Sequence, residues 1–141
     1  METNNKDMLE KWVKWNPIDI PKGDYIVTDF AQNSEGVKII LDNEKDAIQI
    51  FFDGVPSIIR IAVEGIRMRT CREALDRYQD DLFFRNHFLF TIENSQLSKW
   101  VEEESCGFTE AENLMHYCIV TAAEVIDIIA TFEPEVTVSK I

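Results

Sequence analysis

The sequence has few of the residues on which metal and catalytic centres are usually built. It holds two histidines and three cysteines among 141 residues, and its five glycines are scattered singly. Neither histidine has a second histidine or cysteine at the short spacing of a zinc site, and single glycines provide no phosphate-binding loop. Three cysteines without paired spacing fit a reducing compartment better than a disulfide framework. We therefore expect no metal, no cofactor and no catalytic residues.

Long apolar runs are also missing. No stretch approaches the roughly 18–20 apolar residues that a membrane span needs. The first twelve residues, METNNKDMLEKW, carry charges where a signal peptide has an apolar run. These features predict a cytoplasmic protein without a membrane partner. A composition of 45% hydrophobic and 28% charged residues is typical of a globular chain, and its length predicts one domain over residues 1–141.

Basic residues are scarce in the last third of the chain. The formal net charge is −12, and residues 86–141 hold ten acidic residues but only two lysines. Free nucleic acid is therefore a poor direct partner, because like charges repel, whereas a basic protein is a good one. The simpler alternative is that the acidity serves solubility alone.

The first half of the chain is dominated by strand patterns. A short helix is predicted over residues 6–15, because Met8, Leu9, Trp12 and Val13 share one helical face. Four stretches rich in β-branched and aromatic residues then predict strands, at residues 25–30, 36–42, 46–53 and 57–64. Their short connections favour hairpins, and so a four-stranded meander.

The second half mixes helix and strand patterns. Helices are predicted over residues 68–80, from a cap at Asn94 or Ser95 to Gly107, as one turn at 109–112, and over 121–132, where TAAE resembles a capping box. Strands are predicted at residues 88–92, 114–120 and 135–138. The predicted class is α+β, with a mainly antiparallel sheet of about six or seven strands packed by about four helices on one face.

The densest acidic run is the main candidate for function. Glu102, Glu103 and Glu104 are consecutive, and Glu110 and Glu112 follow them closely. A general acid–base pair needs two carboxylates that converge on one cleft, whereas consecutive glutamates fan around a helix. The run is therefore either a solvated face or a docking surface for a basic partner.

Tryptophans are the other candidates for an interface. Trp12 and Trp100 fall on apolar helical stripes and are predicted to lie in the core. Trp15 lies off the stripe near Pro17, which makes it the best candidate for an exposed anchor.

A family resemblance extends over roughly residues 36–64 and 86–138. The residues that carry it are Phe90, Ile92, Glu93, Asn94, Lys99, Trp100, Glu103, Glu104, Ser105, Gly107, His116, Tyr117, Thr121, the apolar run 125–129 and Glu133-Pro134, with IFFDGV at 50–55. This pattern resembles small acidic bacterial immunity proteins of polymorphic toxin and contact-dependent growth inhibition systems.

The resemblance implies a non-enzymatic inhibitor that binds the C-terminal domain of a cognate toxin in the cytoplasm of the producing cell. The implied toxin is a basic nuclease, which fits the acidity of this chain. Two alternatives stay open: a regulatory or adaptor module that binds a basic host protein, and a small hydrolase that uses His116 with Cys118 or nearby carboxylates.

Overall fold

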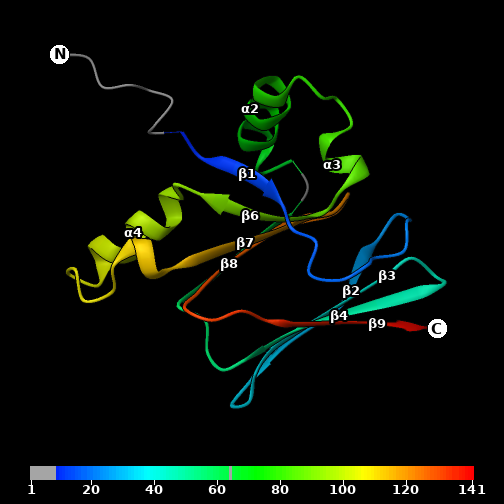
Figure 1. The fold of residues 1–141 in the computed structure, drawn as a ribbon, viewed down its shortest axis with the longest axis horizontal. Coiled ribbons are helices and arrows are strands. Elements are labelled where there is room, and N and C mark those ends of the chain that lie inside the picture. Colours follow the sequence, from blue (N-terminus) through cyan, green and yellow to red (C-terminus); the bar gives the residue numbers. More distant parts are fainter. Residues whose placement is uncertain (1–8, 64) are drawn as a thin grey trace.

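The computed structural model describes residues 9–63 and 65–141, which fold into two antiparallel sheets and a set of short helices (Figure 1). The elements in chain order are β1 (Lys11–Lys14), β2 (Ile26–Asn33), β3 (Gly36–Asp42), β4 (Asp46–Asp53), β5 (Ile58–Val63), α2 (Met68–Tyr78), α3 (Phe83–Asn86), β6 (Leu89–Glu93), α4 (Gln96–Glu104), the 3-10 helix η1 (Ala111–Asn113), β7 (Met115–Val120), β8 (Glu124–Ala130) and β9 (Glu135–Lys140). The α+β class and the predominance of antiparallel sheet are as predicted. The described residues differ from the prediction in having nine strands in two sheets and three α-helices.

The four-stranded sheet has the order β2-β3-β4-β9. Its strands alternate apolar and polar residues, so that one face is apolar: Ile39 pairs with Ile50 and both are fully buried, while Gln49 between such positions is exposed. The hairpins that join β2, β3 and β4 confirm most of the predicted meander. The fourth predicted strand, β5, instead pairs with β8 in the other sheet.

The five-stranded sheet has the order β1-β6-β7-β8-β5 and is covered on both faces. One face packs on the four-stranded sheet through residues such as Leu89, Ile119 and Ile126. The other face carries Trp12 and Phe90 and lies under α2 and α3 (Figure 1). The molecule therefore has a helical layer, a central sheet and an outer sheet.

The prediction of a buried helix over residues 121–132 is wrong, because most of this segment is the central strand β8. A strand that is buried on both faces reads as a continuous apolar run, and such a run cannot be told from a buried helix by periodicity. The hydroxyl of Thr121 accepts hydrogen bonds from the N–H groups of Ala123 and Glu124, both at 3.2 Å. The capping residues thus stabilise the turn between β7 and β8.

The prediction of an N-terminal helix is wrong for the residues that the structure describes. Residues 11–14 form the edge strand β1, in which Trp12 is buried between exposed Lys11 and half-buried Val13. The predicted start at residues 6–8 lies outside the described residues. The predicted helix over 68–80 is confirmed as α2, and Ser95 caps α4 through a 3.0 Å hydrogen bond from the N–H of Ser98. The turn predicted at 109–112 is found as η1.

Candidate functional site

The predicted acidic residues gather where α4 ends and η1 follows it. This part of the chain lies at one end of the molecule, away from the four-stranded sheet (Figure 1). Glu103, Glu104, Glu110 and Glu112 are exposed, whereas Glu102 is half-buried. The structure therefore brings the five predicted carboxylates together at the end of α4 and the start of η1, a region that we call the acidic projection (residues 102–112).

Hydrogen bonds within the acidic projection hold its backbone in place. Glu102 accepts the N–H of Ala111 at 2.8 Å through its carboxylate and the N–H of Gly107 at 2.9 Å through its carbonyl. The hydroxyl of Ser105 accepts the N–H of Thr109 at 3.0 Å. Gly107 has a φ of 78°, a left-handed conformation that glycine adopts without the penalty of a Cβ. Glu102 is thus a structural member of the projection.

The exposed carboxylates of the projection repel one another. The pKa of Glu110 is raised by a hydrogen bond with the side chain of Glu112 and by the negative charge of that side chain. A pKa raised by a neighbouring carboxylate indicates that the two carboxylates lie close together. A cation placed between them would relieve the repulsion.

Aromatic exposure differs from the prediction. Trp12 is buried as predicted, but Trp100 has 46% of its surface exposed, so its assignment to the core is wrong. Trp15 is half-buried, and its ring lies 5.0 Å from that of Tyr117, so it is not the freely exposed anchor that the sequence suggested. Phe108, which sequence reasoning passed over, is 93% exposed within the acidic projection. The signal in the sequence that could have indicated its exposure is its position between Gly107 and polar Thr109.

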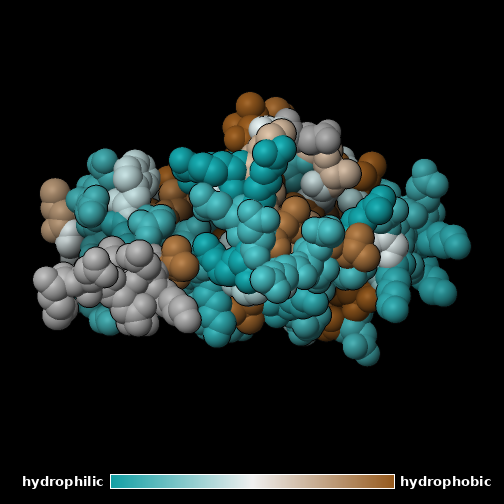
Figure 2. Space-filling view, turned by 90° about the horizontal axis from the view of Figure 1, so that it is seen from above, coloured by the Kyte–Doolittle hydropathy of each residue, from teal (hydrophilic) through white to brown (hydrophobic). Residues whose placement is uncertain are grey.

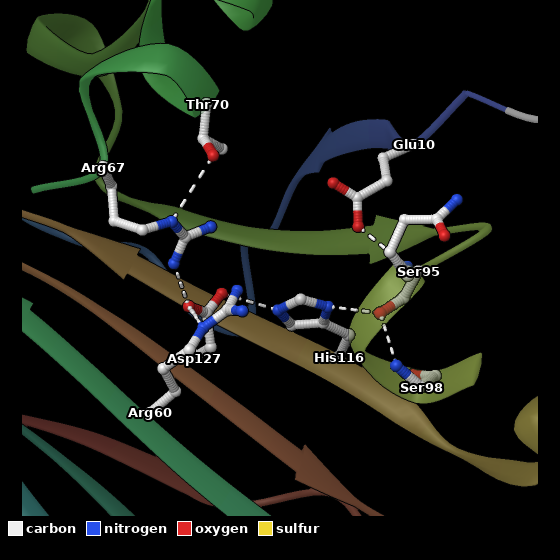
Figure 3. A network of polar contacts seen from close by, with 9 residues as sticks. Glu10, Arg60, Arg67, Thr70, Ser95, Ser98, His116 and Asp127 are labelled. Carbon is white, nitrogen blue, oxygen red and sulfur yellow. Dashed lines mark hydrogen bonds and ion pairs between the residues drawn. The ribbon is translucent and has the colours of Figure 1, made fainter. Parts of the chain in front are cut away.

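A second polar constellation lies inside the molecule, on the helix-facing side of the five-stranded sheet (Figure 3). Asp127 of β8 is fully buried and is the centre of this network. Its Oδ2 accepts hydrogen bonds from Nε of Arg60 at 3.0 Å and from Nη1 of Arg67 at 2.5 Å. Its Oδ1 lies 2.7 Å from Nε2 of His116, whose Nδ1 lies 2.6 Å from the hydroxyl of Ser95.

The chemistry of Asp127 is set by these partners. Burial alone raises the pKa of a carboxyl group, but the hydrogen bond from His116 and the charges of Arg67 and Arg60 hold the pKa of Asp127 well below its usual range. Asp127 is therefore ionised, and an ionised carboxylate only accepts hydrogen bonds. His116 must accordingly donate through Nε2.

The order Ser95, His116, Asp127 has the residue types of a hydrolytic triad, but its surroundings favour a structural role. Ser95 is 6% exposed, and its hydroxyl is already used as the cap of α4. The charge of Asp127 is compensated by two guanidinium groups, whereas a triad carboxylate stabilises the imidazolium that forms during the reaction. The hydroxyl of Ser95 accepts the N–H of Ser98 and lies 2.6 Å from Nδ1 of His116, so both sides of this hydroxyl have partners.

Cys118 shares the helix-facing side of β7 with His116 but is fully buried in the core under α2 and α3. Burial raises the pKa of its thiol well above the usual value, and the charge of Asp127 raises it further. A nucleophilic cysteine needs a lowered pKa and access to substrate. Cys118 has neither property and packs in the core.

The two histidines lie in different places. Nε2 of His87 lies 3.0 Å from the carbonyl oxygen of Trp15, whereas His116 contacts Asp127. Within residues 9–63 and 65–141, no cluster of three or more His, Cys, Asp or Glu side chains is arranged to hold a metal ion. Over the same residues, no helix has the length and apolar character to cross a membrane.

Comparison with known proteins adds no further constraint, since no family model, no curated protein and no solved structure matches this chain.

Proposed function

We propose that this chain is an immunity protein: a non-enzymatic inhibitor that binds the C-terminal domain of a cognate toxin in the cytoplasm of the producing cell. The proposed toxin is a basic nuclease, held in a tight 1:1 complex. The observation that carries the proposal is the exposure of Phe108, 93% open to solvent, within the acidic projection, where Glu103, Glu104, Glu110 and Glu112 are also exposed. The resemblance of residues 86–138 to immunity proteins supports it independently.

The chemistry of the acidic projection suits a basic protein partner. Interfaces draw most of their binding energy from a few large side chains, often aromatic, that become buried on binding. Phe108 and Trp100 are exposed and aromatic, and each is close in sequence to the glutamates at 103 and 104. Complementary charge around such anchors raises the association rate and selects the partner. An acidic surface can also occupy the basic site where a nuclease binds phosphates.

The ordered backbone of the acidic projection also supports a role in binding. The bonds from Glu102 and Ser105 fix the backbone on both sides of Phe108 before any partner arrives. A loop that is already ordered loses little conformational entropy on binding. The projection therefore combines an anchor, a charge pattern and a fixed shape.

The test pairs this chain with the product of the adjacent upstream gene. Co-expression should protect cells from that product, and the two purified proteins should form a 1:1 complex by size-exclusion chromatography. Phe108→Ala should weaken the complex by a factor of about 30, the cost of losing a hot-spot residue of about 2 kcal/mol. Val55→Ala, which also shortens an exposed apolar side chain (69% exposed) on another loop, is the matched control and should bind normally.

Two results would count against the proposal. An upstream product that neither harms cells nor binds this chain would remove its basis. A product that binds through the acidic projection but is harmless would instead favour the adaptor module for a basic host protein.

A further inference from the structure

A pocket of about 650 Å³ opens on the helix-facing side of the five-stranded sheet, between α2 and the beginning of α4. It lies beside the network of Asp127, because Arg60 and Arg67 line it and both bind that carboxylate. Ligand sites in proteins commonly have volumes of about 300–1,000 Å³. Figure 2 looks onto this side of the molecule, which is hydrophilic apart from scattered hydrophobic residues.

The walls of the pocket are held by hydrogen bonds between α2 and β1. The backbone N–H of Trp12 donates to the hydroxyl of Tyr78 at 2.8 Å, and Nη1 of Arg77 donates to the carbonyl of Glu10. Ala74, on the face of α2 that lines the pocket, is buried in the core cluster. The pocket is therefore a formed feature of the fold.

Two guanidinium groups are anchored at the floor of the pocket. Asp127 fixes both, and Nε of Arg67 also points to the hydroxyl of Thr70 at 3.4 Å (Figure 3). Two positive charges on one carboxylate leave a net positive charge. The terminal nitrogens of Arg60 and Nη2 of Arg67 have no hydrogen-bond partner among the described residues. Several N–H donors therefore remain available for a ligand.

The charges around the pocket are positive overall. Four arginines line it or form its floor, Arg60, Arg67, Arg69 and Arg77, against the carboxylates of Glu10, Glu73 and buried Asp127. The carboxylate of Glu10 is already engaged, because it accepts the N–H of Gln96 at 2.9 Å. A local excess of positive charge in a chain of net charge −12 is not explained by solubility.

We propose that this pocket binds a small oxyanion, a phosphate or carboxylate group, through a forked contact with the two terminal nitrogens of Arg60, a contact with Nη2 of Arg67 and an outer contact with Arg69. Arginine forks match the geometry of both groups and form charge-assisted hydrogen bonds. Asp127 holds the guanidinium groups of Arg60 and Arg67 in place, so few additional side chains become ordered when the anion binds. The pocket is cationic and lies outside the acidic projection, so this inference does not rest on the proposed immunity function.

The experiment titrates the full chain with sodium phosphate and, separately, with sodium citrate, following backbone and arginine N–H signals by NMR. Sodium chloride at matched ionic strength is the reference. Saturable shifts should appear at Arg67, Arg69 and Thr70. Response to phosphate alone identifies a phosphate group as the ligand chemistry, and response to citrate alone identifies a carboxylate. Failure of both, or equal shifts with chloride, overturns the proposal.

Matched variants test the roles of the arginines. Arg60→Gln should weaken binding at least tenfold, and Arg69→Gln, which leaves the Asp127 network intact, should weaken it severalfold. Arg85→Gln removes an exposed arginine outside this pocket and should leave affinity unchanged. If Arg60→Gln fails to fold, the comparison of Arg69→Gln with Arg85→Gln still decides, and equal affinities for those two would overturn the proposal.

Discussion

His116 donates a hydrogen bond from Nε2 to Oδ1 of Asp127 across 2.7 Å, and both side chains are almost completely buried. They lie on neighbouring central strands, where Asp127 pairs directly with Cys118 and reaches His116 diagonally. A buried carboxylate is tolerated only where several donors compensate its lost hydration. The Asp127 network is therefore the most sensitive polar feature of the central sheet.

Asp127→Asn should destabilise the fold strongly. The change leaves Arg60 and Arg67 without their anion. It also replaces one acceptor oxygen by an NH2 group, which then faces other hydrogen-bond donors. Breaking a buried ion pair in this way costs about 3–5 kcal/mol. Urea unfolding followed by circular dichroism measures the free energy of unfolding. Asp81→Asn, at an exposed position, is the control and should change it by less than about 0.5 kcal/mol.

Acid should destabilise the wild-type protein through the same residue. The folded pKa of Asp127 is lowered, so the unfolded chain takes up a proton first as the pH falls. The contribution of Asp127 is therefore fully present above the pKa of an unfolded aspartate, about 3.9, and is lost progressively below it. Unfolding free energies measured from pH 6 to pH 2 should fall more steeply below pH 4 for the wild type than for Asp127→Asn. Parallel curves would contradict this assignment.

The network also shows where sequence reasoning succeeds and fails. The strands β3 and β4 were predictable because alternating Ile and polar residues face a single core. β8 was not, because its two faces are both buried and its apolar run suits helix and strand equally well. The lone Asp127 within VIDII was a usable signal, since a charge in an apolar run needs a partner. Its partners Arg60 and His116 come from other strands, so only the tertiary structure could identify them.

On the surface too, local features were predictable from the sequence and features that depend on tertiary packing were not. The clustering of Glu102 to Glu112 was predictable from their closeness in sequence. The exposure of Phe108 and the half-burial of Trp15 were not, because both depend on how a loop and an edge strand dock. Local composition therefore located the candidate surface but not its anchors.

Alkaline pH should weaken the fold through Tyr117. Burial, and secondarily the charge of Glu133, raises the pKa of this phenol to about 12. Because the folded pKa exceeds the unfolded value of about 10, the stabilisation is complete below pH 10 and is lost as the pH rises toward 12. Ultraviolet difference spectra of the tyrosinate should show a late-titrating tyrosine that disappears in Tyr117→Phe. A Tyr117→Phe spectrum identical to the wild type, after scaling for tyrosine number, would contradict the assignment.

The three cysteines should differ sharply in reactivity toward a thiol reagent. Cys106 is exposed and should react within the first phase, Cys71 is half-buried with a pKa raised mainly by burial, and Cys118 is fully buried. Reagent attack requires an accessible thiolate. Cys118 should therefore react only at the rate of unfolding. Cys106→Ser should remove the fast phase alone, and a fast phase of more than one thiol would contradict this order.

Charge reversal in the acidic projection should act on association with the proposed basic partner. Glu103→Lys combined with Glu104→Lys removes two negative charges from the acidic projection and adds two positive ones, so encounter with a basic surface becomes slower. At low salt we expect the association rate constant to fall by about tenfold or more, with a weaker dependence on salt.

The control separates local charge from total charge. Asp29→Lys combined with Glu35→Lys makes the same change in net charge at exposed positions of the four-stranded sheet and its β2–β3 turn. If the acidic projection is the docking surface, this control slows association only slightly when both double variants are compared at 0.1 M salt, because exposed charges beyond about 10 Å are screened there. Equal slowing by both double variants would mean that net charge alone attracts the partner, and the interface would then lie elsewhere.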